Sequence, residues 1–122
     1  MKILVVDDDR DTCRFIADAL DKAGHTVHNV YDGKSAIDEI RSRRYDFMIL
    51  DYKLPDINGL HVLEKVRQLD SPPIVIMISN VGSNDVKLQA KELGVYDFLD
   101  KRFSMGKLVE IVARASGNKK KN

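Results

Sequence analysis

Acidic residues follow two apolar runs of the chain, at positions where their carboxylates could bind a metal ion together. Three consecutive aspartates, Asp7 to Asp9, come directly after residues 3–6, and Asp51 comes directly after residues 47–50. Such apolar runs are typical of buried strands in a parallel sheet, and open α/β sheets bind ligands at the carboxyl ends of their strands. Carboxylates that meet at this edge repel one another unless a cation neutralises them. A hard ion with oxygen ligands, Mg²⁺ above all, fits this chemistry best.

Five short apolar runs alternate with segments of helical periodicity. The expected strands are residues 3–6, 26–30, 47–50, 74–78 and 96–99. In the other segments apolar residues recur every three or four positions, as Cys13, Ile16 and Leu20 do in the first. Alternating strands and helices with short connections form right-handed βαβ units. The sequence therefore predicts an α/β fold, a doubly wound (βα)₅ domain with a five-stranded parallel sheet.

Residues at the ends of the helical segments indicate where helices start and stop. Gly24 and Gly94 come just after the first and fourth segments, where a left-handed residue commonly ends a helix. Asn58 or Asp56 can cap the start of the third helix, and Ser104 can cap the start of the last.

Length and composition fit a single globular domain. The chain has 122 residues, 43% of them hydrophobic, which is enough for one core. We assign residues 1–116 to this domain and expect residues 117–122 to form a flexible basic tail or the start of a linker. The 20 basic residues against 19 acidic ones give no reason to expect direct nucleic-acid or membrane binding. No signal peptide or spanning segment is visible and Cys13 is the single cysteine, so we expect a cytoplasmic protein.

Two further polar residues are expected on the same edge of the sheet as the acids. Ser79 follows the fourth expected strand, and Lys101 lies just past the fifth. With the acids they suit phosphoryl transfer, in which a carboxylate attacks phosphorus. A metal ion, a lysine and a hydroxyl donor would neutralise the phosphoryl oxygens.

At these residues the chain resembles the receiver domains of two-component response regulators, the CheY-like superfamily. Residues 50–59, with Asp51 followed by Leu54-Pro55 and later by Gly59, look like the phosphoacceptor loop of that family. The resemblance extends from Lys2 to about Ser116. It implies a flavodoxin-like sheet with strand order 2-1-3-4-5.

The resemblance also implies the roles of the acidic residues. Asp51 would accept a phosphoryl group from a histidine kinase. Asp7 and Asp8 would hold Mg²⁺ together with Asp51, and the backbone carbonyl of Lys53 would complete the protein ligands. The domain would assist its own phosphorylation and dephosphorylation, as a phosphoprotein rather than a turnover enzyme.

Three more residues match the switch of the family. Ser79 matches the switch hydroxyl, Lys101 the lysine of the site, and Phe98 the switch aromatic. Phosphorylation would then change the face formed by the fourth helix, the fifth strand and the fifth helix. The expected partners are a sensor histidine kinase or phosphotransfer protein, and a downstream protein or an output domain beyond this chain. A homodimer through the same face is a further option.

The chain departs from the family pattern around the site. Asn80 replaces the usual small residue, and Arg102 replaces the usual proline after the lysine. A cis bond before a residue other than proline costs about 2.5–4 kcal/mol, so we expect the Lys101–Arg102 peptide to be trans. Lys53 and Val81 stand where side chains tune the phosphate lifetime, and we expect Lys53 to reach the phosphoryl oxygens.

Two other functions and several plain structural roles compete with this interpretation. Asp7 and Asp9 have the spacing of nucleophile and acid/base in a Mg²⁺-dependent phosphatase, although the chain carries no substrate-recognition insert. A pseudo-receiver would bind partners without phosphorylation.

Asp9 and Asp11 can serve simply as helix caps, and Cys13 as inert core. The histidines lack metal-ligand spacing; they are His25, His28 and His61.

Overall fold

The computed structural model describes residues 1–80 and 84–120, in which five strands alternate with five helices. Their bounds are β1 Lys2–Val6, α1 Arg10–Lys22, β2 Thr26–Val30, α2 Gly33–Ser42, β3 Phe47–Asp51, α3 Gly59–Arg67, β4 Ile74–Ser79, α4 Asn84–Glu92, β5 Asp97–Asp100 and α5 Met105–Lys120. Val81, expected to tune phosphate lifetime, and residues 121–122 of the expected tail lie outside the described residues. Within the described part of the chain no helix is long and apolar enough to span a membrane.

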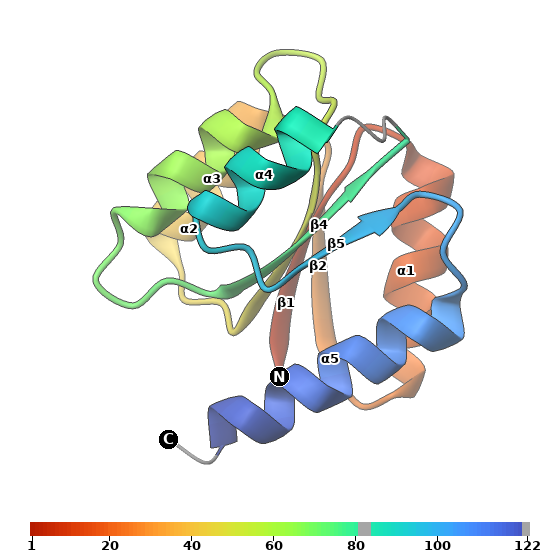
Figure 1. Ribbon diagram of the computed structural model, residues 1–122. Coiled ribbons are helices and arrows are strands. Elements are labelled where there is room, and N and C mark those ends of the chain that lie inside the picture. Colours follow the sequence, from red (N-terminus) through yellow and green to blue (C-terminus); the bar gives the residue numbers. More distant parts are fainter. Residues whose placement is uncertain (81–83, 121–122) are drawn as a thin grey trace.

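The five strands form one parallel sheet in the order β2-β1-β3-β4-β5, which confirms the predicted topology (Figure 1). The register sets the carboxyl ends of the central strands beside one another. Asp51 of β3 pairs with Ile78 of β4, and Ser79 of β4 pairs with Asp100 of β5. The residues expected to do chemistry therefore stand at one edge of the sheet.

Alternate residues of the strands supply two separate hydrophobic cores. Met48 and Leu50 of β3 belong to the core covered by α2, α3 and α4. Phe47 and Ile49 belong to the core covered by α1 and α5 on the other face. Figure 1 shows the two groups of helices on opposite sides of the sheet. This alternation is the period-two pattern of a strand, and it explains why the central strands are apolar throughout.

Several predicted helix ends are confirmed. Gly24 and Gly94 have positive φ angles of 94° and 85°. The side chain of Asn58 accepts a hydrogen bond from the backbone N–H of His61 at the start of α3. Ser104 accepts one from the backbone N–H of Lys107 in α5.

Asp56, the alternative cap, has a different role. Its carboxylate accepts hydrogen bonds from the backbone N–H groups of Gly33 and Lys34, at 2.8 and 2.9 Å. These are the first residues of α2. Asp56 therefore ties the β3–α3 loop to the start of another helix.

The last helix is longer than expected. We expected residues 117–122 to form a flexible tail or the start of a linker, but α5 continues to Lys120. Ala115 is fully buried and Ser116 is 8% exposed, so the packed surface of the helix reaches the position where the tail was expected to begin. The boundary of the domain at residue 116 stays a prediction.

Gly59 allows α3 to start against the backbone of the expected phosphoacceptor. A Cβ at this position would lie 2.5 Å from the carbonyl oxygen of Asp51 and 2.9 Å from the Cα of Tyr52. The N–H of Gly59 also donates to the carbonyl of Tyr52 at 2.6 Å. Only glycine permits this close approach of the two segments.

We therefore expect Gly59→Ala to lower the free energy of unfolding by about 1–3 kcal/mol, the range for overpacking at a close contact. Gly106→Ala is the matched control, because nothing lies within 4 Å of a Cβ at that position in α5. It should be neutral or stabilise by up to about 1 kcal/mol. Urea denaturation measures both variants, and equal effects would contradict the steric argument.

Candidate functional site

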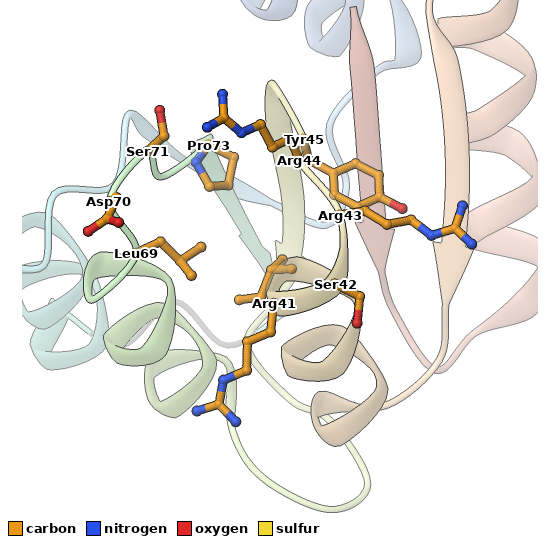
Figure 2. Close-up of a pocket in the computed structure, with 10 residues that line it drawn as sticks. Arg41, Ser42, Arg43, Arg44, Tyr45, Leu69, Asp70, Ser71 and Pro73 are labelled. Carbon is orange, nitrogen blue, oxygen red and sulfur yellow. The ribbon is translucent and has the colours of Figure 1, made fainter.

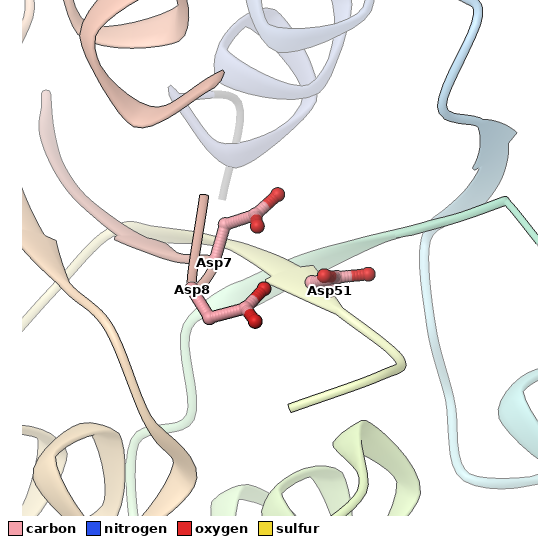
Figure 3. A group of neighbouring side chains, drawn as sticks. All are labelled: Asp7, Asp8 and Asp51. Carbon is pink, nitrogen blue, oxygen red and sulfur yellow. The ribbon is translucent and has the colours of Figure 1, made fainter. Parts of the chain in front are cut away.

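Three carboxylates converge at the carboxyl edge of the sheet. Asp7 and Asp8 follow β1 and Asp51 ends β3, and their ligand atoms all lie within 4.8 Å of one another. Figure 3 shows the three side chains projecting to the same side. Asp7 is fully buried and Asp51 is 2% exposed, whereas Asp8 is exposed. The predicted acidic cluster is therefore present, with its opening to solvent on the side of Asp8.

Lys101 is the cation of this cluster. Its Nζ donates to Asp7 Oδ1 at 3.2 Å and to Asp51 Oδ2 at 3.1 Å. Its side chain is only 14% exposed. One ammonium group thus joins two buried carboxylates that come from different strands.

Backbone hydrogen bonds extend each strand ladder into the site. The N–H of Asp7 donates to the carbonyl of Val30, and the N–H of Lys101 donates to that of Ser79 at 2.9 Å. The N–H of Tyr52, next to Asp51, donates to the carbonyl of Ile78 at 3.0 Å. The sheet therefore fixes the backbone from which each charged side chain projects.

The cluster shifts the protonation of its members. Burial and, second, the charge of Asp7 raise the pKa of Asp51 to about 6, although Lys101 partly offsets both. Burial lowers the pKa of Lys101, but its hydrogen bonds and ion pairs with Asp7 and Asp51 outweigh this and raise it. Lys101 therefore stays charged, whereas the ionisation of Asp51 is less favourable than that of an aspartate exposed to water.

The donor set suits a divalent cation. Three carboxylates face one lysine, so the cluster keeps an excess of negative charge. Among the described residues, the buried Asp7 Oδ2 accepts no hydrogen bond, although it lies 3.0 Å from Lys101 Nζ. A buried oxygen with unused acceptor capacity beside two other carboxylates matches the all-oxygen coordination of Mg²⁺.

A cavity of about 300 Å³ opens directly onto the cluster. Its lining contains the acceptor, the lysine, the first departure from the family pattern (Asn80) and the expected lifetime residue Lys53; the full set is Asp8, Asp51, Lys53, Leu54, Pro55, Ser79, Asn80 and Lys101. Ser79 is 2% exposed at the end of β4, while Lys53 and Asn80 are exposed at the mouth. The cavity lining thus includes the expected residues except Phe98 and Asp7, and the carboxylate of Asp7 belongs to the buried cluster beside it.

A second cavity of about 300 Å³ lies between the α2–β3 and α3–β4 loops (Figure 2). Arg41, Arg43 and Arg44 line it, but Figure 2 shows their side chains pointing in different directions. Arg43 is also paired with Glu39, at 3.4 Å. No convergent group of polar atoms forms there, so the acidic edge is the better candidate for chemistry.

Other predicted residues take ordinary structural roles. Asp9 is the N-cap of α1, and hydrogen bonds from Thr12 lower its pKa. A carboxylate held in this way is a poor proton donor, which disfavours the phosphatase hypothesis. Cys13 is buried, and burial raises its pKa to about 12, consistent with inert core.

The loop after β5 holds the second departure from the family pattern. The Lys101–Arg102 peptide is trans, as expected, since the described residues contain no cis bond. Arg102 donates its backbone N–H and its guanidinium to Asp100, which closes a short turn. This paired turn stands where the family has proline.

Two contacts near the site were not predicted from the sequence. Asp56 binds the start of α2, and Lys87 of α4 lies over the ring of Phe98 at 5.7 Å from its centroid. Asp56 joins the β3–α3 loop to α2, and Lys87 joins α4 to the strand that follows it. Neither contact has a spacing signal, because such pairs depend on how the elements pack.

The sequence matches known receiver domains. The profile of the response regulator receiver domain family matches residues 3–113. The response regulator ArlR of Staphylococcus aureus is 35% identical over 108 residues, which are 88% of this chain and 49% of that protein. The chain belongs to the response regulator receiver domain family, a signalling class rather than a class of classical enzymes. It spans about half the length of the curated relatives it matches.

Solved structures agree with this assignment. The receiver domain of a Francisella response regulator is 30% identical with a TM-score of 0.84, over 94% of this chain and 98% of that one. NtrX of Brucella abortus is 31% identical with a TM-score of 0.88, over 98% of this chain and 27% of that one. A CheY-like receiver domain of Methanospirillum hungatei, 23% identical, has a TM-score of 0.94 over 98% of this chain and 96% of that one, which shows the fold alone.

The raised pKa of Asp51 predicts that Asp51→Asn stabilises the metal-free protein at neutral pH. The folded-state pKa of about 6 exceeds the ordinary value of 3.8, so the contribution of Asp51 to stability is complete below pH 3.8 and is lost as the pH rises through 6. At pH 7.5 we expect a gain of about 1–2 kcal/mol in the free energy of unfolding, allowing for screening.

Urea denaturation with chelator at pH 7.5 and pH 5 measures this gain, which should shrink at the lower pH. Asp18→Asn is the control, because Asp18 is exposed on α1. It should change the free energy of unfolding by less than about 0.5 kcal/mol at either pH. A loss of stability in Asp51→Asn at pH 7.5 would contradict the electrostatic argument.

Proposed function

We propose that this receiver domain accepts a phosphoryl group on Asp51 and passes the signal on through the face formed by α4, β5 and α5. The observation that carries the proposal is the arrangement of Asp51 and Asp7 around Lys101. The family assignment supports it, because the resemblance to receiver domains implies a phosphorylation site at these residues.

The geometry suggests a division of labour during phosphoryl transfer. An oxygen of Asp51 forms a bond to phosphorus while the bond from phosphorus to the donor breaks. With a phosphohistidine donor, the electron pair stays on the imidazole nitrogen, which then takes a proton from solvent. Lys101 neutralises part of the charge on the phosphoryl oxygens, and the hydroxyl of Ser79 donates a hydrogen bond to one of them. The cavity that Asp51 lines has room for this group.

Mg²⁺ would be held by the carboxylates of Asp7, Asp8 and Asp51 with the backbone carbonyl of Lys53. Once bound, it supplies positive charge that the single lysine cannot provide. Lys53 and Asn80 stand at the cavity mouth, where water must enter to remove the phosphate. We expect these two side chains to set the lifetime of the acyl phosphate.

The signal would leave the site through Ser79 and Phe98. Ser79 bonds the new phosphoryl group and draws its loop inward, and Phe98 turns into the space that this movement leaves. The single added dianion thereby shifts the equilibrium between two packing arrangements of the α4–β5–α5 face. Leu88 and Tyr96 are 57% and 38% exposed on this face, so it offers apolar surface to a partner.

The partners follow from this scheme. A sensor histidine kinase or phosphotransfer protein would supply the phosphoryl group. A downstream protein, an output domain beyond this chain, or a second copy would read the altered face.

Intact-protein mass after incubation with acetyl phosphate tests the function. We expect the gain of one phosphoryl group in wild type with Mg²⁺, and none with chelator or in Asp51→Asn. Asp18→Asn, the exposed control, should be phosphorylated like wild type.

An adduct that persists in Asp51→Asn would place the acceptor elsewhere. If wild type gains no adduct and does not bind beryllofluoride, the domain would be a pseudo-receiver.

The rate at which the adduct decays in Lys53→Ala then tests the role of Lys53, and a decay rate equal to that of wild type would refute it.

A further inference from the structure

The ring of Phe98 contacts a cation on the neighbouring helix. Lys87 Nζ of α4 lies 5.7 Å from the ring centroid, within the distance at which an aromatic face attracts an ammonium group. Phe98 is half-buried, and its ring packs at the edge of the core shared with α4. Lys87 itself is exposed. The contact therefore lies at the surface of the α4–β5–α5 face.

The charges around Lys87 leave it available to the ring. Hydrogen bonds from Arg102 lower the pKa of Asp100 to about 2, and the charge of Lys87 contributes less. Arg102 Nε and Nη2 each lie 3.0 Å from the Asp100 carboxylate. Asp100 is thus paired with Arg102, and Lys87 forms no ion pair within the described part of the chain. Its ammonium group interacts with Phe98 instead.

Lys87 has little role in the packing of α4. In this helix the buried residue is Ala90, and Lys87 lies on the exposed surface. Replacing its side chain should therefore leave the core intact. An effect of Lys87 on the site must then pass through its charge or through the ring of Phe98.

We propose that Lys87 is a positioning residue for the switch, and that its ammonium group holds the Phe98 ring in the half-buried orientation of the unphosphorylated domain. This inference rests on the proposed function, in which the ring turns inward after phosphorylation. A ring that turns inward moves away from the ammonium group and loses their attraction. For a contact at an exposed site, that attraction biases the equilibrium about two- to fivefold toward the unphosphorylated arrangement.

The affinity for beryllofluoride, measured by ¹⁹F NMR titration with Mg²⁺ present, tests the inference. Beryllofluoride stands in for the phosphoryl group on Asp51 without requiring chemistry. We expect Lys87→Gln to bind it about two- to fivefold more tightly than wild type. Removing a positive charge near an anion would by itself weaken binding, so tighter binding reports the loss of the ring contact.

Three controls separate the ring contact from other effects. Lys87→Arg keeps a cation over the ring and should bind like wild type. Lys91→Gln removes an exposed lysine four residues further along α4 and should not tighten binding. In a Phe98→Leu background, Lys87→Gln should change the affinity no further, because the ring is absent.

Equal or weaker binding by Lys87→Gln would overturn the inference, as would the same tightening in the Phe98→Leu background. If wild type binds beryllofluoride, neither of these results contradicts the proposed function. Failure of wild type itself to bind beryllofluoride would overturn the proposed function and this inference together.

Discussion

The ion pair of Lys101 with two buried carboxylates is the interaction on which the rest of the site depends. Asp7 and Asp51 are almost completely removed from water, and each would be strongly unfavourable there without a counter-charge. Lys101 neutralises part of this charge at distances of 3.0–3.2 Å, yet Asp51 still has a pKa raised to about 6. The fold thus maintains an acidic site that one lysine does not balance. That imbalance favours a divalent cation and, with it, a phosphoryl group.

The fold positions this charge cluster through rigid elements. Neighbouring parallel strands end side by side, and two hydrophobic cores, one on each face of the sheet, fix their backbones. Gly59 lets α3 pack against the backbone of Asp51, and Asp56 ties the same loop to α2. Ser79 ends β4 and Phe98 lies within the neighbouring strand β5, so the two residues proposed to carry the signal stand on adjacent strands of the sheet.

Much of this architecture could be predicted from the sequence. Central strands are recognisable as apolar runs, and polar residues just after them had to meet at one edge, so Asp7, Asp51, Ser79 and Lys101 could be placed together from their positions after the strands. Their roles come from the resemblance to receiver domains and stay predictions. The extent of the last helix was not predicted: Ala115 and Ser116 are buried, and α5 continues to Lys120, into the residues expected to form a flexible tail. The contacts of Asp56 and Lys87 could not be predicted, since they depend on how a loop packs against α2 and how α4 packs against β5 rather than on any local pattern.

The most direct test of the central claim is isothermal titration of the domain with Mg²⁺ at pH 7.5. If the carboxylates are held together for a cation, wild type binds one ion per chain. Asp7→Asn should then weaken the affinity by about tenfold or more, equivalent to about 1.4 kcal/mol, and Asp18→Asn should not change it. No binding by wild type, or equal binding by Asp7→Asn, would contradict the account, because the buried acidic cluster would then have no cation to hold.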